Sequence, residues 1–151
     1  MSPAPAQVLE KVAGENLEYT VKRASEVNFD SSLVVLAASP GRGNGLFLAK
    51  DVPADCAVIS GMAIEIAPEE YPLFDESNAS NYAFEHPRDE KAALLVLGLP
   101  SFLNHSKTPN CRYHWDFYEG IGWVLSMISL RPLTAGTELT FDYECSWFDV
   151  V

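Results

Sequence analysis

Residues 104–111 read NHSKTPNC, and further along the chain residues 138–143 read ELTFDY. The first segment sets a polar Asn104-His105-Ser106 corner after an apolar run (92–99), where its side chains are costly to bury unless they are hydrogen-bonded. The second alternates apolar and polar residues and ends in Tyr143, as a strand that ends at a functional site would. These two segments indicate where a site should be sought.

The composition predicts one globular domain. The chain has 151 residues, of which 48% are hydrophobic and 21% are charged, and this length suffices to bury well over half of the unfolded surface. No apolar run reaches the length of a membrane span. The first residues, MSPAP, lack the basic and apolar regions of a signal peptide, so we expect a cytoplasmic or nuclear protein that is not secreted. The three cysteines (Cys56, Cys111, Cys145) are widely spaced and favour free thiols over disulfides or a zinc cage.

The charge balance argues against direct binding to nucleic acid. Twenty-one acidic residues against ten basic ones give a net charge of −11. The stretch from Asp51 to His86 holds eight acids and no Lys or Arg. Such a field would speed the encounter with a basic partner, although a solvated acidic surface that only aids solubility is an open alternative.

Hydrophobic patterning predicts a mainly β domain with few short helices. Residues 7–12 are consistent with a short helix and 16–21 with a strand. Residues 68–75 suggest a loop with a helical turn, and 90–99 a short buried helix. The remaining predicted elements are strands, at 32–37 (buried), 45–48, 57–66 with a bend near Gly61, 113–118 paired with 122–129 in a hairpin, and 137–143.

The segment GRGNGLF at 41–47 precedes these two motifs, and all three resemble, in order and spacing, the signatures of SET-domain protein lysine methyltransferases. The resemblance spans 31–147, leaving 1–30 as an N-terminal extension and 148–151 as a C-terminal tail. It implies a β-clip of small sheets in which the Asn-His segment is threaded beneath a C-terminal loop in a knot-like crossing. It also implies S-adenosylmethionine-dependent methylation of lysine in a histone tail or another basic protein. A homodimer stays open.

The resemblance also assigns residues to the cofactor. The glycine segment would line the S-adenosylmethionine pocket through Arg42, Gly43, Asn44 and Gly45, largely by its main chain, although a tight turn without a ligand is the alternative. Asn104 and His105 would supply donors and acceptors to the cofactor. The same corner fits an N-glycosylation sequon or a purely structural turn. Trp147 would stack on the adenine ring, or would only pack against the core.

Tyr143 is the predicted catalytic residue, because a phenol at the inner end of a dry channel can orient an amine toward a methyl donor. Tyr113 and Tyr82 are predicted as channel walls, with ordinary packing as the alternative for each. Lys107 replaces a cysteine that many members use to bind zinc, which predicts a zinc-free domain resembling small viral and bacterial members. Residues 60–63 (SGMA) replace a usual Tyr-x-Gly, and Ser101 replaces a frequent arginine. These departures leave open a catalytically inert module that binds cofactor or peptide.

Overall fold

The computed structural model describes residues 8–11, 18–27 and 29–143. By their internal contacts the residues form two compact units. The first unit comprises Met1–Asn28, Gly61–Gly98 and His114–Leu125, and the second comprises Phe29–Ser60, Leu99–Tyr113 and Ser126–Val151. Each is described by itself below. Within the described residues no helix is long and apolar enough to cross a membrane.

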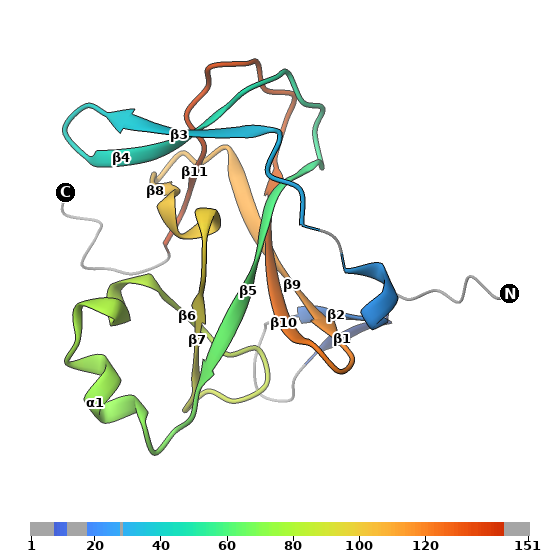
Figure 1. Cartoon of the computed structure of the whole chain (residues 1–151), viewed down its shortest axis with the longest axis vertical. Coiled ribbons are helices and arrows are strands. Elements are labelled where there is room, and N and C mark those ends of the chain that lie inside the picture. The colour runs from blue at the N-terminus through green and yellow to red at the C-terminus, as the bar shows by residue number, and fades with distance from the viewer. Residues whose placement is uncertain (1–7, 12–17, 28, 144–151) are drawn as a thin grey trace, which may run out of the picture. The chain divides into compact units, whose positions relative to one another are not determined.

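Strands dominate the chain, and the predicted mainly β fold is confirmed (Figure 1). The largest sheet has the order β1-β2-β9-β10-β5-β7-β6. Its strands are β1 (Val8–Lys11), β2 (Glu18–Lys22), β5 (Ala57–Ile66), β6 (Ala83–Glu85), β7 (Ala93–Val96), β9 (Cys111–Tyr118) and β10 (Gly122–Ser129). Two smaller sheets pair β3 (Val34–Ser39) with β4 (Gly43–Leu48), and β8 (Asn104–His105) with β11 (Thr140–Phe141).

In the part of the chain that the structure describes, helical structure is confined to short segments. They are α1 (Tyr71–Asp75) and the 3₁₀ turns η1 (Ala24–Glu26), η2 (Asn78–Tyr82) and η3 (Leu99–Phe102). The helical turn predicted within 68–75 is therefore confirmed.

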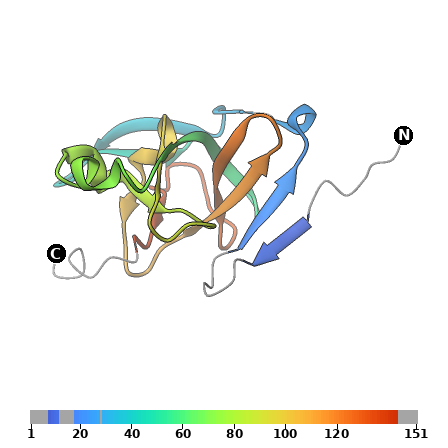
Figure 2. The same ribbon diagram turned by 90° about the horizontal axis from the view of Figure 1, so that it is seen from below.

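Several predicted strands are also confirmed. The hairpin of β9 and β10 turns at 119–121, where the N–H of Ile121 bonds the carbonyl of Tyr118 at 2.9 Å. The segment predicted at 16–21 is β2, which pairs in parallel with β9, Tyr19 opposite Trp115. Figure 2 shows this blue strand beside the orange hairpin. The segment 57–66 forms one strand, β5.

Three expectations were wrong. The helix predicted at 90–99 is wrong: residues 93–96 form β7, which pairs with β5 on one side and β6 on the other, and only Leu99 is helical, as the first residue of η3. A short buried apolar run does not distinguish these two structures. Of the residues 7–12 considered for a helix, the described ones, 8–11, likewise form a strand, β1, which pairs antiparallel with β2. Residues 32–37 are not a buried strand, since only Val34 and Ser39 of β3 are buried.

Aromatic rings fill the interior of the first unit. Trp123 lies edge-on to Tyr19 and Phe117 at centroid distances of 5.0 Å each, and to Trp115 at 6.2 Å. Leu94 of β7 is completely buried in this unit. The second unit has its own buried residues, among them Leu46, Val58, Leu103, Met127 and Leu139.

Replacing Leu94 by alanine tests the reassigned strand β7. The variant should lose about 2–5 kcal/mol of unfolding free energy, because a fully buried leucine leaves a cavity. Leu73 in α1 is 78% exposed, so Leu73→Ala in the same unit should change stability by less than about 0.5 kcal/mol. Urea unfolding measures both, and equal effects would contradict the burial of β7.

Candidate functional site

The segments 104–111 and 138–143 meet as neighbouring strands in the second unit. Strands β8 and β11 run parallel, with Asn104 opposite Thr140 and His105 opposite Phe141. The N–H of Ser106 continues the pairing to the carbonyl of Phe141 at 3.1 Å.

A buried amide fastens this pairing. Asn110, 6% exposed, donates from Nδ2 to the carbonyl of Glu138 at 2.8 Å and accepts the N–H of Thr140 at Oδ1 at 2.9 Å. Its own N–H bonds Oγ1 of Thr140 at 3.3 Å. Because the side chain of Asn110 is buried, each of these bonds that is lost would leave its amide without a partner away from water, which is costly.

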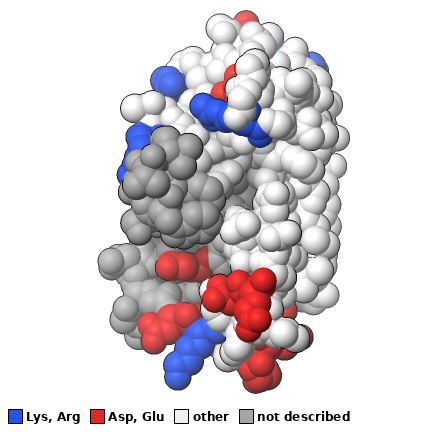
Figure 3. Space-filling view, turned by 90° about the vertical axis from the view of Figure 1, so that its left-hand side faces the viewer, with Lys and Arg blue, Asp and Glu red and all other residues white. Residues whose placement is uncertain are grey.

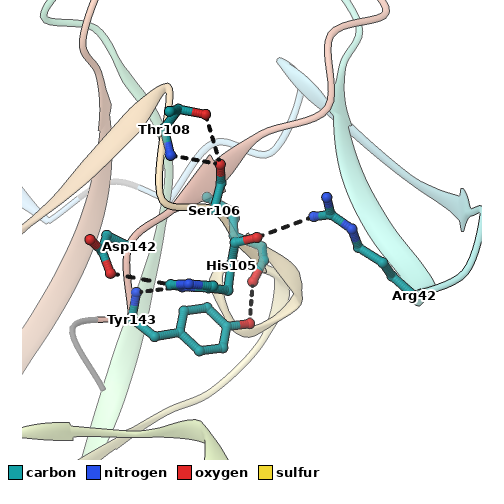
Figure 4. Close-up of polar contacts among 7 residues, drawn as sticks. Arg42, His105, Ser106, Thr108, Asp142 and Tyr143 are labelled. Atoms are coloured by element: carbon teal, nitrogen blue, oxygen red, sulfur yellow. Dashed lines mark hydrogen bonds and ion pairs between the residues drawn. The ribbon is translucent and has the colours of Figure 1, made fainter. Parts of the chain in front are cut away.

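Tyr143 turns its phenol toward the Asn-His segment. Its ring lies edge-on to His105 at 5.0 Å, and its hydroxyl donates to the carbonyl of Leu103 at 2.8 Å. The backbone N–H of Tyr143 donates to Nδ1 of His105 at 3.0 Å, so this nitrogen is an acceptor in the neutral ring. Oδ1 of Asp142 lies 3.8 Å from the same atom. Figure 4 shows the phenol and the imidazole side by side.

A row of rings extends from this pair. The ring centroids of Phe141 and Tyr143 are 4.7 Å apart, and the ring of Phe141 also lies edge-on to Tyr113 at a centroid distance of 6.2 Å. Phe141 is 7% exposed, whereas Tyr113 and Tyr143 are half-buried. The second unit thus brings the predicted residues Tyr143, Tyr113 and His105 into one aromatic group, with Phe141 as a member that sequence reasoning missed. The alternation of buried Leu139 and Phe141 is the signal that points to it.

The glycine segment approaches the Asn-His segment directly. The carbonyl of Asn44 accepts a hydrogen bond from Nδ2 of Asn104 at 3.1 Å. Figure 4 shows the second contact, in which the guanidinium of Arg42 donates to the carbonyl of His105 at 3.2 Å. Gly43 has a φ of +80°, a conformation that favours glycine. A Cβ at Gly43 would meet no atom within 4 Å, so the loop is open on that side. These groups could hold a polar ligand.

A turn stabilised by its own side chains ends the Asn-His corner. Oγ of Ser106 accepts the N–H of Thr108 at 3.0 Å, and Figure 4 shows the two side chains facing each other. Lys107 between them is exposed. Within the described residues no three His, Cys, Asp or Glu side chains gather as metal ligands would. The expectation of a zinc-free domain stays a prediction.

Two predicted site residues are not joined to this group by the described structure. Tyr82 belongs to the first unit, ends η2 and is 53% exposed. Trp147 lies outside the described residues, as does Cys145. Their roles stay predictions.

A family model named SET domain matches residues 43–144. The chain belongs to the SET-domain family. Human histone-lysine N-methyltransferase 2D is 34% identical over 124 residues, covering 77% of this chain and 2% of that protein. Histone-lysine N-methyltransferase SETD7 of Halocynthia roretzi is 28% identical over 125 residues, covering 76% and 32%. The chain therefore spans a minor part of both relatives.

Solved structures share the fold. A putative histone methyltransferase of Plasmodium falciparum, PFL0690c, superposes with a TM-score of 0.64 at 21% identity, covering 79% of this chain and 99% of that one. The ctPRC2 structure in an autoinhibited conformation bound to S-adenosylmethionine superposes with a TM-score of 0.63 at 22% identity, covering 76% and 15%. The SET-domain fold class inferred from the motifs is thus confirmed.

Replacing Asn110 by alanine should loosen the pairing of β8 and β11. We expect a loss of about 1–3 kcal/mol of unfolding free energy, since the carbonyl of Glu138 and the N–H of Thr140, both in half-buried residues, lose their partner. Exposed Asn78 is the matched control, and Asn78→Ala should cost less than about 0.5 kcal/mol. Denaturant unfolding measures the stability of both variants. An Asn110→Ala variant as stable as the wild type would contradict the stabilising role of Asn110.

Cys111, the first residue of β9, should resist alkylation in the folded protein. Burial raises the pKa of its thiol to about 12, and nearby Arg131 offsets this only in part. Iodoacetamide reacts with the thiolate, so at mildly alkaline pH we expect modification of half-buried Cys56 well before Cys111. Peptide mass spectrometry resolves the two sites, with denatured protein as the control in which both react. Equal rates in the folded protein would contradict the burial.

Proposed function

We propose that this chain is the catalytic domain of a protein-lysine N-methyltransferase that uses S-adenosylmethionine. One observation carries the proposal: the phenol of Tyr143 lies against His105 and donates to the carbonyl of Leu103, next to the paired strands β8 and β11. The relatives named above are histone-lysine methyltransferases. A basic protein such as a histone is therefore the proposed substrate.

The residues near Asn104 fit a cofactor with a polar amino-acid part. Asn104 presents a carbonyl oxygen that can accept a hydrogen bond from an ammonium group, and the loop beside Gly43 is open. The neighbouring ctPRC2 structure is described as bound to S-adenosylmethionine. We propose that Asn104, His105 and 42–45 hold this cofactor, whose chemistry is the donation of a methyl group from a sulfonium. Trp147 stays a proposed contact.

The chain's own part in the reaction is alignment and exclusion of water. Lysine has a pKa near 10.4, so forming the neutral amine at pH 7 costs about 5 kcal/mol. An apolar, aromatic surrounding lowers this cost by disfavouring the ammonium. Phe141 and the half-buried Tyr113 and Tyr143 supply such a surrounding in the second unit. The hydroxyl of Tyr143 donates its proton to the carbonyl of Leu103, which leaves its oxygen able to accept a hydrogen bond from an amine.

Surface charge suits a basic substrate. The face in Figure 3 carries acidic side chains gathered over its lower part. Exposed acids flank α1 on both sides: Glu69 and Glu70 before it, and Asp75 and Glu76 at its end. A negative field of this kind raises the rate at which a basic partner is met.

A second candidate is an inert module that binds cofactor or peptide without turnover. The observation that favours it is the segment 60–63 (SGMA), which replaces the family's Tyr-x-Gly, and in which the hydroxyl of Ser60 is bonded to that of Ser126 at 2.7 Å. A small hydroxyl that already has a partner cannot replace an aromatic wall.

Replacing Tyr143 by phenylalanine separates the two candidates. With labelled cofactor and a panel of basic proteins, the wild type should transfer label, and Tyr143→Phe should lose about 10²-fold or more because one oriented oxygen is removed. Tyr71→Phe, in exposed α1, is the matched control and should retain transfer. Binding of S-adenosylhomocysteine without transfer would favour the inert module. Undiminished transfer by Tyr143→Phe would refute the catalytic role of this residue.

A further inference from the structure

Glu138 holds a position in the site that its place in the sequence does not predict. Its Oε1 accepts the hydroxyl of Ser39 at 3.0 Å, and its Oε2 accepts Nδ2 of Asn104 at 2.7 Å. Ser39 is 3% exposed. The backbone of Glu138 is itself fixed, because its carbonyl accepts the amide of Asn110 and it bridges to Phe47. The carboxylate is therefore held from several sides.

This carboxylate determines which way the amide of Asn104 points. Nδ2 of Asn104 faces two groups, the carboxylate of Glu138 and the carbonyl of Asn44 at 3.1 Å. Both groups only accept hydrogen bonds, so the amide nitrogen must face them and the amide oxygen must face away. Without Glu138 the amide would have one acceptor instead of two, and its two orientations would differ less in energy.

The glycine segment is shaped around the same contact. A Cβ on Gly45 would lie 2.5 Å from Oε2 of Glu138 and 3.1 Å from Nδ2 of Asn104. Gly41 and Gly43 have positive φ angles, but Gly45 is not among the residues with positive φ. A Cβ at position 45 would therefore displace the carboxylate of Glu138, so this position is restricted by space and not by backbone conformation. Three separate segments thus meet at the bond between Glu138 and Asn104.

We propose that Glu138 is a positioning residue for cofactor binding. It orients Asn104 so that Oδ1 accepts a hydrogen bond from a donor group of the cofactor, and it acts through Asn104 without contacting the cofactor itself. This inference rests on the proposed function, in which Asn104 binds the cofactor. The hydrogen-bonding capacity of the Glu138 side chain is what matters, and its negative charge is not required.

Calorimetric titration with S-adenosylhomocysteine tests the proposal. Glu138→Ala should raise Kd about tenfold, the loss expected for one well-oriented hydrogen bond. Glu138→Gln should stay within about threefold of the wild type. Its amide oxygen can accept from Asn104 while its NH₂ donates to the hydroxyl of Ser39. If Glu138→Gln bound as weakly as Glu138→Ala, the charge would be the active feature and the proposal would fail.

A double-mutant cycle shows whether Glu138 acts through Asn104. In an Asn104→Ala background, Glu138→Ala should weaken binding by no more than about twofold further. Additive losses would overturn the proposal, because they would mean that Glu138 acts independently. An unchanged Kd for Glu138→Ala in the wild-type background would overturn it as well.

Thermal unfolding of each variant shows that the comparison is made on folded protein. Should Glu138→Ala not fold, Ser39→Ala replaces it in the cycle, since it removes only the donor to Oε1; we expect Kd to rise about two- to threefold, and only in the presence of Asn104. A wild type that does not bind S-adenosylhomocysteine refutes the proposed function and the positioning role together. A wild type that binds, with variants that bind equally well, refutes the positioning role alone.

Discussion

The buried side chain of Asn110 holds together the two segments on which the site depends. Strands β8 and β11 share only two residue pairs, too few for independent stability. The amide of Asn110, itself buried, adds bonds to the carbonyl of Glu138 and the N–H of Thr140. The register of these two strands places Phe141 opposite His105, and the edge-on packing of Tyr143 against His105 follows from that register. A one-residue slip would turn Tyr143 to the opposite side and remove Glu138 from Asn104.

Local patterns predicted much of the fold, and the motifs that resemble the SET-domain family pointed to side chains that lie together in the structure. The β9–β10 hairpin and the turn at α1 were expected from alternation and turn residues alone. Asn104, His105, Tyr113 and Tyr143 were singled out and lie in one unit. Glu138 and Asn110 were within the quoted segments but unrecognised. Their partners explain why: Ser39 is 99 positions from Glu138, and no local pattern reports a contact over that separation.

The errors have a common physical origin, which is that burial is decided by neighbours in space. Residues 92–99 are apolar without a clear period, and such a run suits a buried helix or a central strand equally. Pairing with β5 and β6 makes residues 93–96 of this run a strand, β7. Strand β3 shows the opposite error. Its apolar residues gave the correct element, yet Val35 and Leu36 are 49% and 44% exposed; among the described strands β3 pairs with β4 alone.

The acidic character of the chain and the chemistry proposed for it place opposite demands on charge. A negative field attracts a basic substrate, but negative groups beside the substrate amine would favour its ammonium form. The described contacts separate these demands by environment. Exposed acids act through solvent, where salt screens them over about 8 Å. The carboxylate of Glu138 is instead directed at the neutral donors Ser39 and Asn104, each oxygen accepting one hydrogen bond. Its charge is thereby met by protein dipoles, and the rings of Tyr143, Phe141 and Tyr113 present no charge to an amine.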